Sequence, residues 1–162
     1  MPMPVTAAIA LGSNLGDRHA NLTRATHLLA AAPGISHFRC SAFIETVPLR
    51  VDRADPGGCY LNAAAVLHTT LPPLTLLQTL QTIEQAMGRD RATQPHGAAR
   101  VIDLDLVLYG DVIINSPVLT LPHPAMHERD FVLGPLAAIA PDLVIPTTGR
   151  TIAAELARLS IG

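Results

Sequence analysis

Two aspartates, Asp103 and Asp105, are the pair of side chains in this chain best suited to chemistry. They lie within the segment 100–109, RVIDLDLVLY, where aliphatic residues alternate with them. Such alternation predicts a β-strand with an aliphatic core face, and residues two apart on a strand project from the other face together. Two neighbouring carboxylates repel each other unless a cation lies between them, and Mg²⁺ prefers oxygen ligands of this kind. The pair therefore favours a divalent-metal site, although a bare D-x-D pattern also fits the solvated face of an edge strand.

Basic side chains flank the two acids. Arg100 comes just before them, His123 and Arg129 follow, and Arg89 and Arg91 lie a short way upstream. All eleven basic residues are arginines, so phosphate binding must rely on guanidinium groups, which bind oxyanions in a bidentate manner. Acids beside arginines indicate a site for metal-bound phosphate. A solvated surface position is the alternative for any single arginine, most of all for Arg91.

The stretch from Arg100 to Leu136 resembles the 6-hydroxymethyl-7,8-dihydropterin pyrophosphokinase family of folate biosynthesis. Four upstream motifs occur in the order of that family, so the resemblance runs from about residue 7 to about residue 146. They are Ala10–Gly16 (ALGSNLG), Glu45–Pro48 (ETVP), Tyr60–Ala64 (YLNAA) and Ile83–Arg91 (IEQAMGRDR). The segment Pro95–Ala99 departs from the family, because it has one extra residue and lacks the usual tryptophan.

The resemblance implies an Mg²⁺-dependent enzyme that transfers diphosphate from ATP to the pterin alcohol, giving AMP. It makes Asp103 and Asp105 the ligands of two Mg²⁺ ions and Arg100 the strongest candidate for transition-state assistance, with Arg89 beside it. It also implies a set of ATP-binding residues: Glu84, Arg91, Thr120, His123 and Arg129. For Glu84, a helix-surface acid is the alternative.

A pterin is a flat ring with a row of hydrogen-bonding groups, so it needs stacking partners and edge contacts. The resemblance assigns stacking to Tyr60 and Phe131 and places the side-chain amide of Asn62 at the pterin edge. Backbone groups near Thr46, Pro48 and Leu49 complete this predicted set. Core packing is the alternative for every aromatic residue, and it is preferred for Phe38.

Composition limits the class of protein. A chain of 162 residues with 49% hydrophobic and 15% charged residues fits a single domain, residues 1–162, with a real core. A formal net charge of −2 argues against nucleic-acid binding, and no apolar run is long enough to span a membrane. Cys40 and Cys59 form no C-x-x-C pair, so a reduced, cytoplasmic location is expected. We expect a monomer whose partners are the small molecules ATP and the pterin.

Hydrophobic spacing predicts the elements that position these residues. Strands are expected at about 6–11, 38–44, 61–67 and 101–109, and helices from 17 to 32, from 72 to 87, from 130 to 139 and from 152 to 159. Gly110-Asp111 is expected to turn into a hairpin-like segment at 112–114. The resulting β-α-β-β-α-β order matches an α+β, ferredoxin-like fold with an antiparallel sheet, two helices on one face and extra C-terminal helices.

Two other functions remain open from the sequence. One is a pterin- or nucleotide-binding module that has lost catalysis through the altered 95–99 segment. The other is a metal-dependent phosphodiesterase that uses the same aspartates. The phosphodiesterase gives no role to Tyr60, Asn62 and Phe131.

Overall fold

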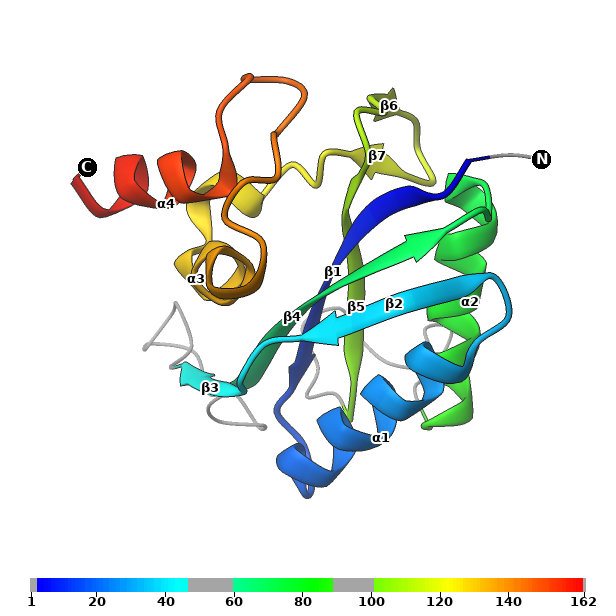
Figure 1. Cartoon of the computed structure of the whole chain (residues 1–162). Helices are drawn as coiled ribbons and strands as arrows, with labels where there is room; N and C mark the ends of the chain where they lie inside the picture. Colours follow the sequence, from blue (N-terminus) through cyan, green and yellow to red (C-terminus); the bar gives the residue numbers. More distant parts are fainter. Residues whose placement is uncertain (1–2, 47–59, 89–100, 162) are drawn as a thin grey trace.

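A computed structural model describes residues 3–46, 60–88 and 101–161. The core elements are β1 (Val5–Ser13), α1 (Arg18–Ala31), β2 (Ile35–Cys40), β3 (Ile44–Thr46), β4 (Tyr60–Thr69), α2 (Pro73–Ala86) and β5 (Asp103–Tyr109). The C-terminal part contains β6 (Ile114–Asn115), β7 (Thr120–Leu121), the 3-10 turn η1 (Met126–Glu128), α3 (Asp130–Ile139) and α4 (Ile152–Ile161). Figure 1 shows these elements.

The main sheet is antiparallel and has the strand order β2-β4-β1-β5, with β3 paired to the end of β4. β1 pairs with β4 from Val5↔Thr69 to Ser13↔Leu61, and it pairs with β5 from Ala7↔Tyr109 to Gly12↔Asp103. This order and direction are those of the predicted ferredoxin-like arrangement, which is therefore confirmed. β5 is an edge strand.

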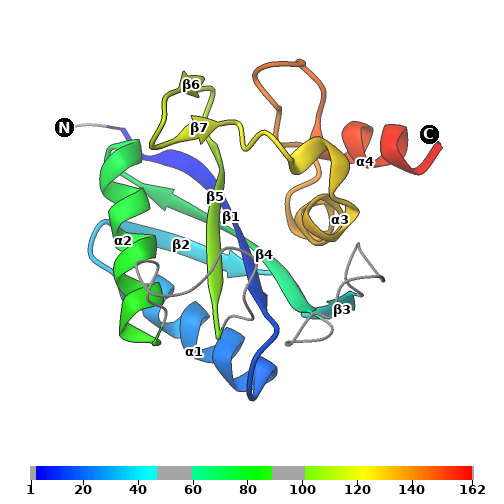
Figure 2. The ribbon, with the colours of Figure 1, turned by 180° about the vertical axis from the view of Figure 1, so that it is seen from behind.

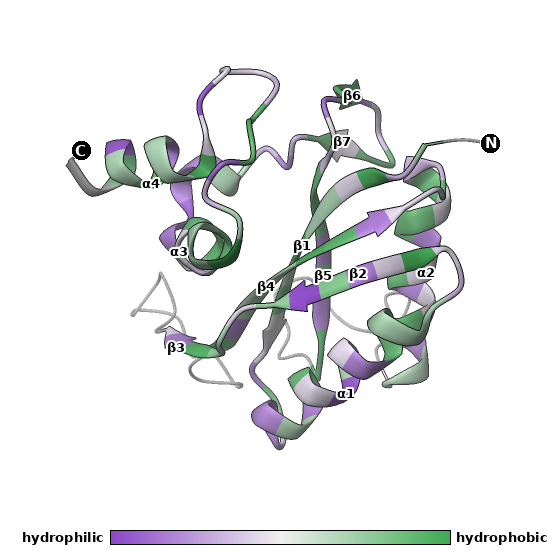
Figure 3. Cartoon of the chain, in the orientation of Figure 1, coloured by the Kyte–Doolittle hydropathy of each residue, from purple (hydrophilic) through white to green (hydrophobic). Residues whose placement is uncertain are grey.

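Hydrophobic cores lie on both faces of the sheet. On one face α1 and α2 cover residues such as Leu11 and Leu104, while on the other face α3 and α4 cover residues such as Ala64 and Val66. Figures 1 and 2 show the two helix pairs on opposite sides of the sheet. Figure 3 shows β4, in the middle of the sheet, mostly in the hydrophobic colour. No helix among residues 3–46, 60–88 and 101–161 is long and apolar enough to cross a membrane.

Helix boundaries follow local signals. The side chain of Asp17 caps α1 by accepting a hydrogen bond from the Ala20 N–H at 3.0 Å, which satisfies one of the free donors at the helix start. In α2, Leu76, Leu80, Ile83 and Met87 are buried, as their spacing predicts. The 130–139 helix is confirmed at both ends, and the last helix runs two residues beyond the predicted end.

Two local predictions were wrong because strand pairing is irregular. The single strand expected at 38–44 is divided into β2 and β3, and the register against β4 changes by one residue between Cys40↔Ala65 and Ile44↔Asn62. A second shift, between Ala8 and Ile9 opposite β5, moves Leu108 from the α1–α2 face into the core beneath α3. The turn expected at Gly110-Asp111 is present, and the hairpin that follows pairs β6 with β7, from Ile114↔Leu121 to Asn115↔Thr120.

Candidate active site

Asp103 and Asp105 project from the same face of β5, as their spacing predicts. Their neighbours across the strand pair are Gly12 and Ala10 of β1. The intervening residue Leu104 packs into the core on the α1–α2 side. The carboxylates therefore lie on the opposite face, and small residues beside them on β1 leave room for a ligand.

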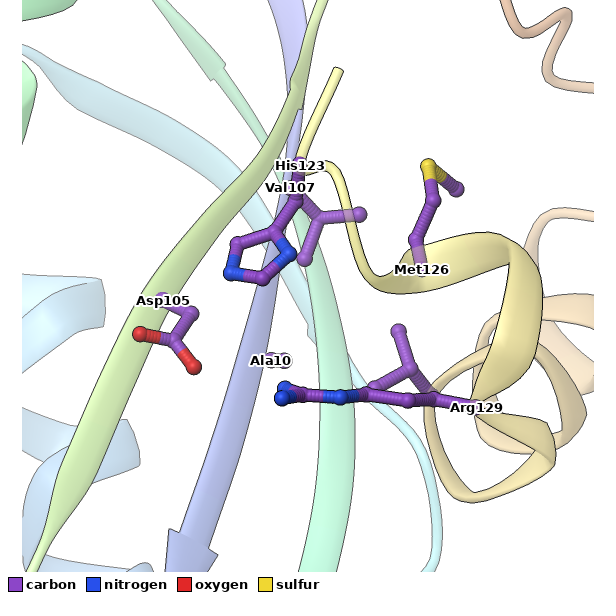
Figure 4. A pocket seen from close by; sticks show the side chains of 7 residues that line it. Ala10, Asp105, Val107, His123, Met126 and Arg129 are labelled. Atoms are coloured by element: carbon purple, nitrogen blue, oxygen red, sulfur yellow. The ribbon is translucent and has the colours of Figure 1, made fainter. Parts of the chain in front are cut away.

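A small pocket on this face brings Asp105 together with His123 and Arg129. It is lined by Ala10, Asp105, Val107, His123, Met126, Arg129 and Val132. Figure 4 shows the Asp105 carboxylate of β5 and, from the segment before α3, the His123 ring and the Arg129 guanidinium, around one hollow. Three groups predicted from sequence to handle metal-bound phosphate thus meet in space.

Backbone hydrogen bonds hold His123 against β5 and select its tautomer. The His123 N–H donates to the carbonyl of Val107 at 2.9 Å, and the Ala125 N–H donates to Nδ1 of the His123 ring at 3.1 Å. Since Nδ1 accepts, the neutral ring carries its proton on Nε2 and can donate there to a phosphate oxygen. Burial, followed by the positive charge of Arg129, lowers the pKa of His123 below 6.5, while the charge of Asp103 acts in the opposite direction. Burial and the charge of Arg129 therefore favour the neutral ring.

Arg129 links the phosphate side of the pocket to a predicted stacking residue. It is the residue before α3, and its guanidinium carbon lies 5.7 Å from the centre of the Phe131 ring. This is the geometry of a cation–π contact. Phe131 is only partly buried at the start of α3.

The pterin-binding candidates meet at the junction of β3 and β4. Asn62 is 7% exposed, and its Nδ2 donates to the hydroxyl of Thr46 at 2.5 Å. Tyr60 lies opposite Thr46 across the same strand pair. A Cβ at Gly12 would lie 3.0 Å from Oδ1 of Asn62 and 3.3 Å from Cδ1 of Tyr60. The absence of a side chain at Gly12 therefore lets these two candidates occupy their places.

One row of residues across the sheet connects the two groups. Asn62 of β4, Gly12 of β1 and Asp103 of β5 are direct neighbours in register. Ala64, Ala10 and Asp105 form the next row. The pterin candidates and the carboxylates thus lie on one continuous face with small residues between them.

Glu84 lies in a place that the sequence did not predict. Its side chain is 1% exposed, so it is not the helix-surface acid of the alternative interpretation. Its Oε2 accepts a hydrogen bond from the backbone N–H of Leu104, between the two aspartates, at 2.8 Å. Contact with ATP stays a prediction for Glu84, and its burial against β5 argues against that contact.

The structure brings together only part of the predicted set. Thr120 lies in β7, on the β6–β7 hairpin, and does not line the pocket. Pro48, Leu49, Arg89, Arg91, Arg100 and the altered 95–99 segment lie outside the described residues. The pocket also contains residues that sequence reasoning missed, namely Ala10, Val107, Met126 and Val132. Of these, only Ala10 could be suspected from sequence. Ala10 and Gly12 alternate with the larger Leu11, so a strand here has small residues on one face, and that face lies beside the aspartates.

The donor set fits a magnesium site that is completed by the substrate. Within the described residues, no group of three or more His, Cys, Asp or Glu side chains converges as a metal site. Asp103 and Asp105 supply two carboxylates on one face. Mg²⁺ is commonly held by one or two carboxylates together with substrate phosphates and water, so this number of protein ligands fits it.

Comparisons with known proteins support one family. The family model described as 7,8-dihydro-6-hydroxymethylpterin-pyrophosphokinase (HPPK) matches residues 8–141. A 2-amino-4-hydroxy-6-hydroxymethyldihydropteridine pyrophosphokinase of Synechocystis is 42% identical over 146 residues, which cover 90% of this chain and 72% of the relative. The enzyme of the same name from Methylorubrum extorquens is 43% identical over 153 residues, covering 94% of this chain and 92% of the relative. Folic acid synthesis protein fol1 of Schizosaccharomyces pombe is 39% identical, but the chain covers only 20% of its length.

Solved structures agree in fold. A Plasmodium falciparum HPPK-DHPS crystal structure with pteroate superposes with a TM-score of 0.73 at 15% identity, over 98% of this chain and 43% of that one. The chain therefore spans less than half of this larger protein, and the likeness shows the fold alone. The family match over residues 8–141 and the two relatives at 42% and 43% identity show that this chain belongs to the HPPK family.

Proposed function

We propose that residues 1–162 act as one pyrophosphokinase domain that transfers a diphosphate group from ATP to 6-hydroxymethyl-7,8-dihydropterin. The observation that carries this proposal is the row Asn62–Gly12–Asp103, which places a pterin-edge candidate and a phosphate-metal candidate on the same face of the sheet. A binding site for each substrate on one continuous surface is what direct transfer between them requires. The names of the two relatives from Synechocystis and Methylorubrum extorquens describe the same activity.

The reaction exchanges one phosphorus–oxygen bond for another. The pterin hydroxyl oxygen forms a bond to the β-phosphorus of ATP, and the bond from that phosphorus to the α–β bridging oxygen breaks. AMP leaves with the bridging oxygen, the β- and γ-phosphoryl groups remain on the pterin, and the hydroxyl proton passes to solvent. Such transfers depend on positioning and on neutralising charge, more than on covalent chemistry by the protein.

Each described residue has a defined task in this proposal. Asn62, held by Thr46, presents its amide to the pterin edge, and Tyr60 and Phe131 enclose the ring. His123 donates from Nε2 to a phosphate oxygen, and Arg129 supplies positive charge beside it. Asp103 and Asp105 would hold Mg²⁺, which when bound would supply positive charge to neutralise the phosphate oxygens.

Further residues enter from the family resemblance. Arg100, with Arg89, is proposed to assist the transition state, and Arg91 and Thr120 are proposed to contact ATP. Pro48 and Leu49 are proposed to complete the pterin edge contacts through their backbones.

A product assay tests the proposal directly. The protein is mixed with ATP, Mg²⁺ and 6-hydroxymethyl-7,8-dihydropterin, and the nucleotide product is identified by chromatography. AMP formed in equal amount with pterin diphosphate is the expected result. ADP would instead indicate an ordinary kinase, and ligand binding without turnover would indicate a binding module. Release of AMP without any pterin product would favour the phosphodiesterase.

A further inference from the structure

A buried carboxylate in the C-terminal helix has no part in the proposed chemistry. Glu155 of α4 is 0% exposed and lies beyond residue 141, where the family match ends. Three basic side chains surround it. Arg150 Nε donates to Oε2 at 2.7 Å, Arg158 Nη2 and Nε donate to Oε1 at 2.5 and 3.1 Å, and His127 Nδ1 lies 3.1 Å from Oε1.

The charge state of this group is fixed by its partners. Hydrogen bonding from Arg158, assisted by Arg150 and His127 and opposed by burial, lowers the pKa of Glu155 from its usual 4.5 to about 2. The group is thus an anion at neutral pH, and a carboxylate only accepts hydrogen bonds. His127 must therefore carry its proton on Nδ1 and donate it to Glu155.

His127 belongs to the short segment that brings His123 and Arg129 to the pocket. At one end, the His123 N–H bonds to Val107 of β5 at 2.9 Å. At the other end, the Arg129 carbonyl accepts from the N–H groups of Val132 and Leu133, both at 3.0 Å, in the first turn of α3. Between these ends η1 is a single 3-10 turn, a conformation with poor hydrogen-bond geometry that needs outside support.

Besides backbone hydrogen bonds within the turn, such as the one from the Met126 N–H to the His123 carbonyl at 3.2 Å, two side-chain contacts join its middle to other described parts of the chain. Met126 is 1% exposed in the core beneath α3, and His127 bonds to Glu155. The backbone hydrogen bonds fix the internal geometry of the turn, whereas the apolar contact of Met126 gives its orientation against the core little direction. The charge-assisted hydrogen bond from His127 adds a direction, and such bonds are the stronger class.

We propose that Glu155 is a positioning residue, which acts through His127 to fix η1 and so orients His123 and Arg129 in the pocket. α4 is then a brace for the phosphate side of the site and not only a cover for the second core. Arg150 and Arg158 hold the carboxylate in place from their positions in the chain before and within α4. The identity of the ligand, a nucleotide phosphate, rests on the proposed function. The positioning of η1 by Glu155 does not depend on that function.

Three single variants separate the brace from general stability. His127→Ala removes the link to η1 and leaves Glu155 with both arginines. His127→Gln restores a side-chain donor to Glu155, and Arg158→Ala removes another partner of Glu155 without touching η1. Hydrogen–deuterium exchange of the peptide 122–133 reports the order of η1, and calorimetric titrations with MgATP and with the pterin report each ligand separately.

Faster exchange at η1 and weaker MgATP binding, on the order of tenfold, are expected for His127→Ala, since one charge-assisted hydrogen bond is lost. Pterin affinity should change much less. His127→Gln should recover most of both effects, and Arg158→Ala should have a smaller effect than His127→Ala in both, because Arg150 and His127 still bond to the carboxylate. Unchanged exchange in His127→Ala, or faster exchange with unchanged MgATP affinity, would overturn the inference. If the unmodified protein does not bind MgATP, the proposed function fails, while the exchange data still decide whether the brace exists.

Discussion

The Glu84 carboxylate accepts a hydrogen bond from the backbone N–H of Leu104 at 2.8 Å, and Leu104 is the residue between the two aspartates. Among the described residues, β5 pairs with β1 on one side only, so no described strand accepts from its outward N–H groups. A buried acid on α2 takes the place of such a strand. The separation and direction of Asp103 and Asp105 therefore depend on a helix residue that is remote from them in sequence.

Glu84→Ala is expected to raise the Mg²⁺ concentration needed for half-maximal nucleotide binding, because β5 loses the acceptor that fixes it between the aspartates. It should also lower the free energy of unfolding by about 1–3 kcal/mol, the cost of an unsatisfied buried donor. Glu84→Gln keeps an acceptor and should behave nearly normally. Leu76→Ala, a buried change on the same helix, controls for destabilisation alone. A loss of nucleotide affinity that is equal with and without Mg²⁺ would support a direct ATP contact instead.

Gly12→Ala tests the row that joins the two halves of the site. The added Cβ would lie 3.0 Å from Asn62 Oδ1, so Asn62 must move and its bond to Thr46 must lengthen. We expect pterin affinity to fall roughly tenfold, corresponding to one weakened hydrogen bond, with little change in ATP affinity. Gly134→Ala is the matched control, because a Cβ there meets no atom within 4 Å. Equal pterin affinity in the two variants would contradict a role for Gly12 in shaping the site.

The parts of the fold with a local cause could be predicted from sequence. Leu76, Leu80 and Ile83 face the core because helical spacing puts them on one side, and Asp103 and Asp105 share a face because strand residues alternate. The division of β2 from β3 and the displacement of Leu108 could not be predicted, because they arise from register shifts between strands far apart in the chain.

The candidate site shows the same limit. Asp105, His123 and Arg129 were predicted from their residue types and spacing, and the structure places them around one pocket. Glu84 was expected to face ATP or solvent, since helical position alone does not reveal a bond to an edge strand. The partners of Glu155 are 28, 5 and 3 residues away in sequence, so only the tertiary fold identifies them as one cluster.

The Glu155 cluster makes stability depend on pH in the acid range. The folded-state pKa of about 2 lies below the usual 4.5, so the stabilisation is present above about pH 4.5 and is lost as the pH falls towards 2. The contribution is smaller than about 1.4 kcal/mol for each unit of pKa change, because Arg150 and Arg158 are half exposed and water screens their charges. Urea unfolding at several pH values should therefore show a steeper acid loss in the unmodified protein than in Glu155→Gln. Parallel pH profiles for the two proteins would show that Glu155 does not titrate in this way.

Phe131→Ala should weaken pterin binding by roughly 1–3 kcal/mol, through lost apolar contact and ring stacking. ATP affinity should change little, although Arg129 loses the ring that lies 5.7 Å from its guanidinium carbon. Separate calorimetric titrations with pterin and with MgATP measure the two effects. Equal losses for both ligands would mean that Phe131 orders the start of α3 and does not stack on the pterin.

Asp103→Asn and Asp105→Asn test the metal assignment, because each change removes one negative oxygen ligand and keeps the side-chain shape. Turnover should fall by roughly 10²-fold or more, as charge on the transferred group is no longer neutralised. Stability should hold or rise slightly, since repulsion between the two carboxylates is relieved. Asp111→Asn, at an exposed carboxylate in the turn after β5, is the matched control and should leave Mg²⁺-dependent turnover unchanged. Near-normal Mg²⁺-dependent activity in either active-site variant would show that the metal is held elsewhere, and His123 with Arg129 would then have to bind phosphate without a metal beside Asp105.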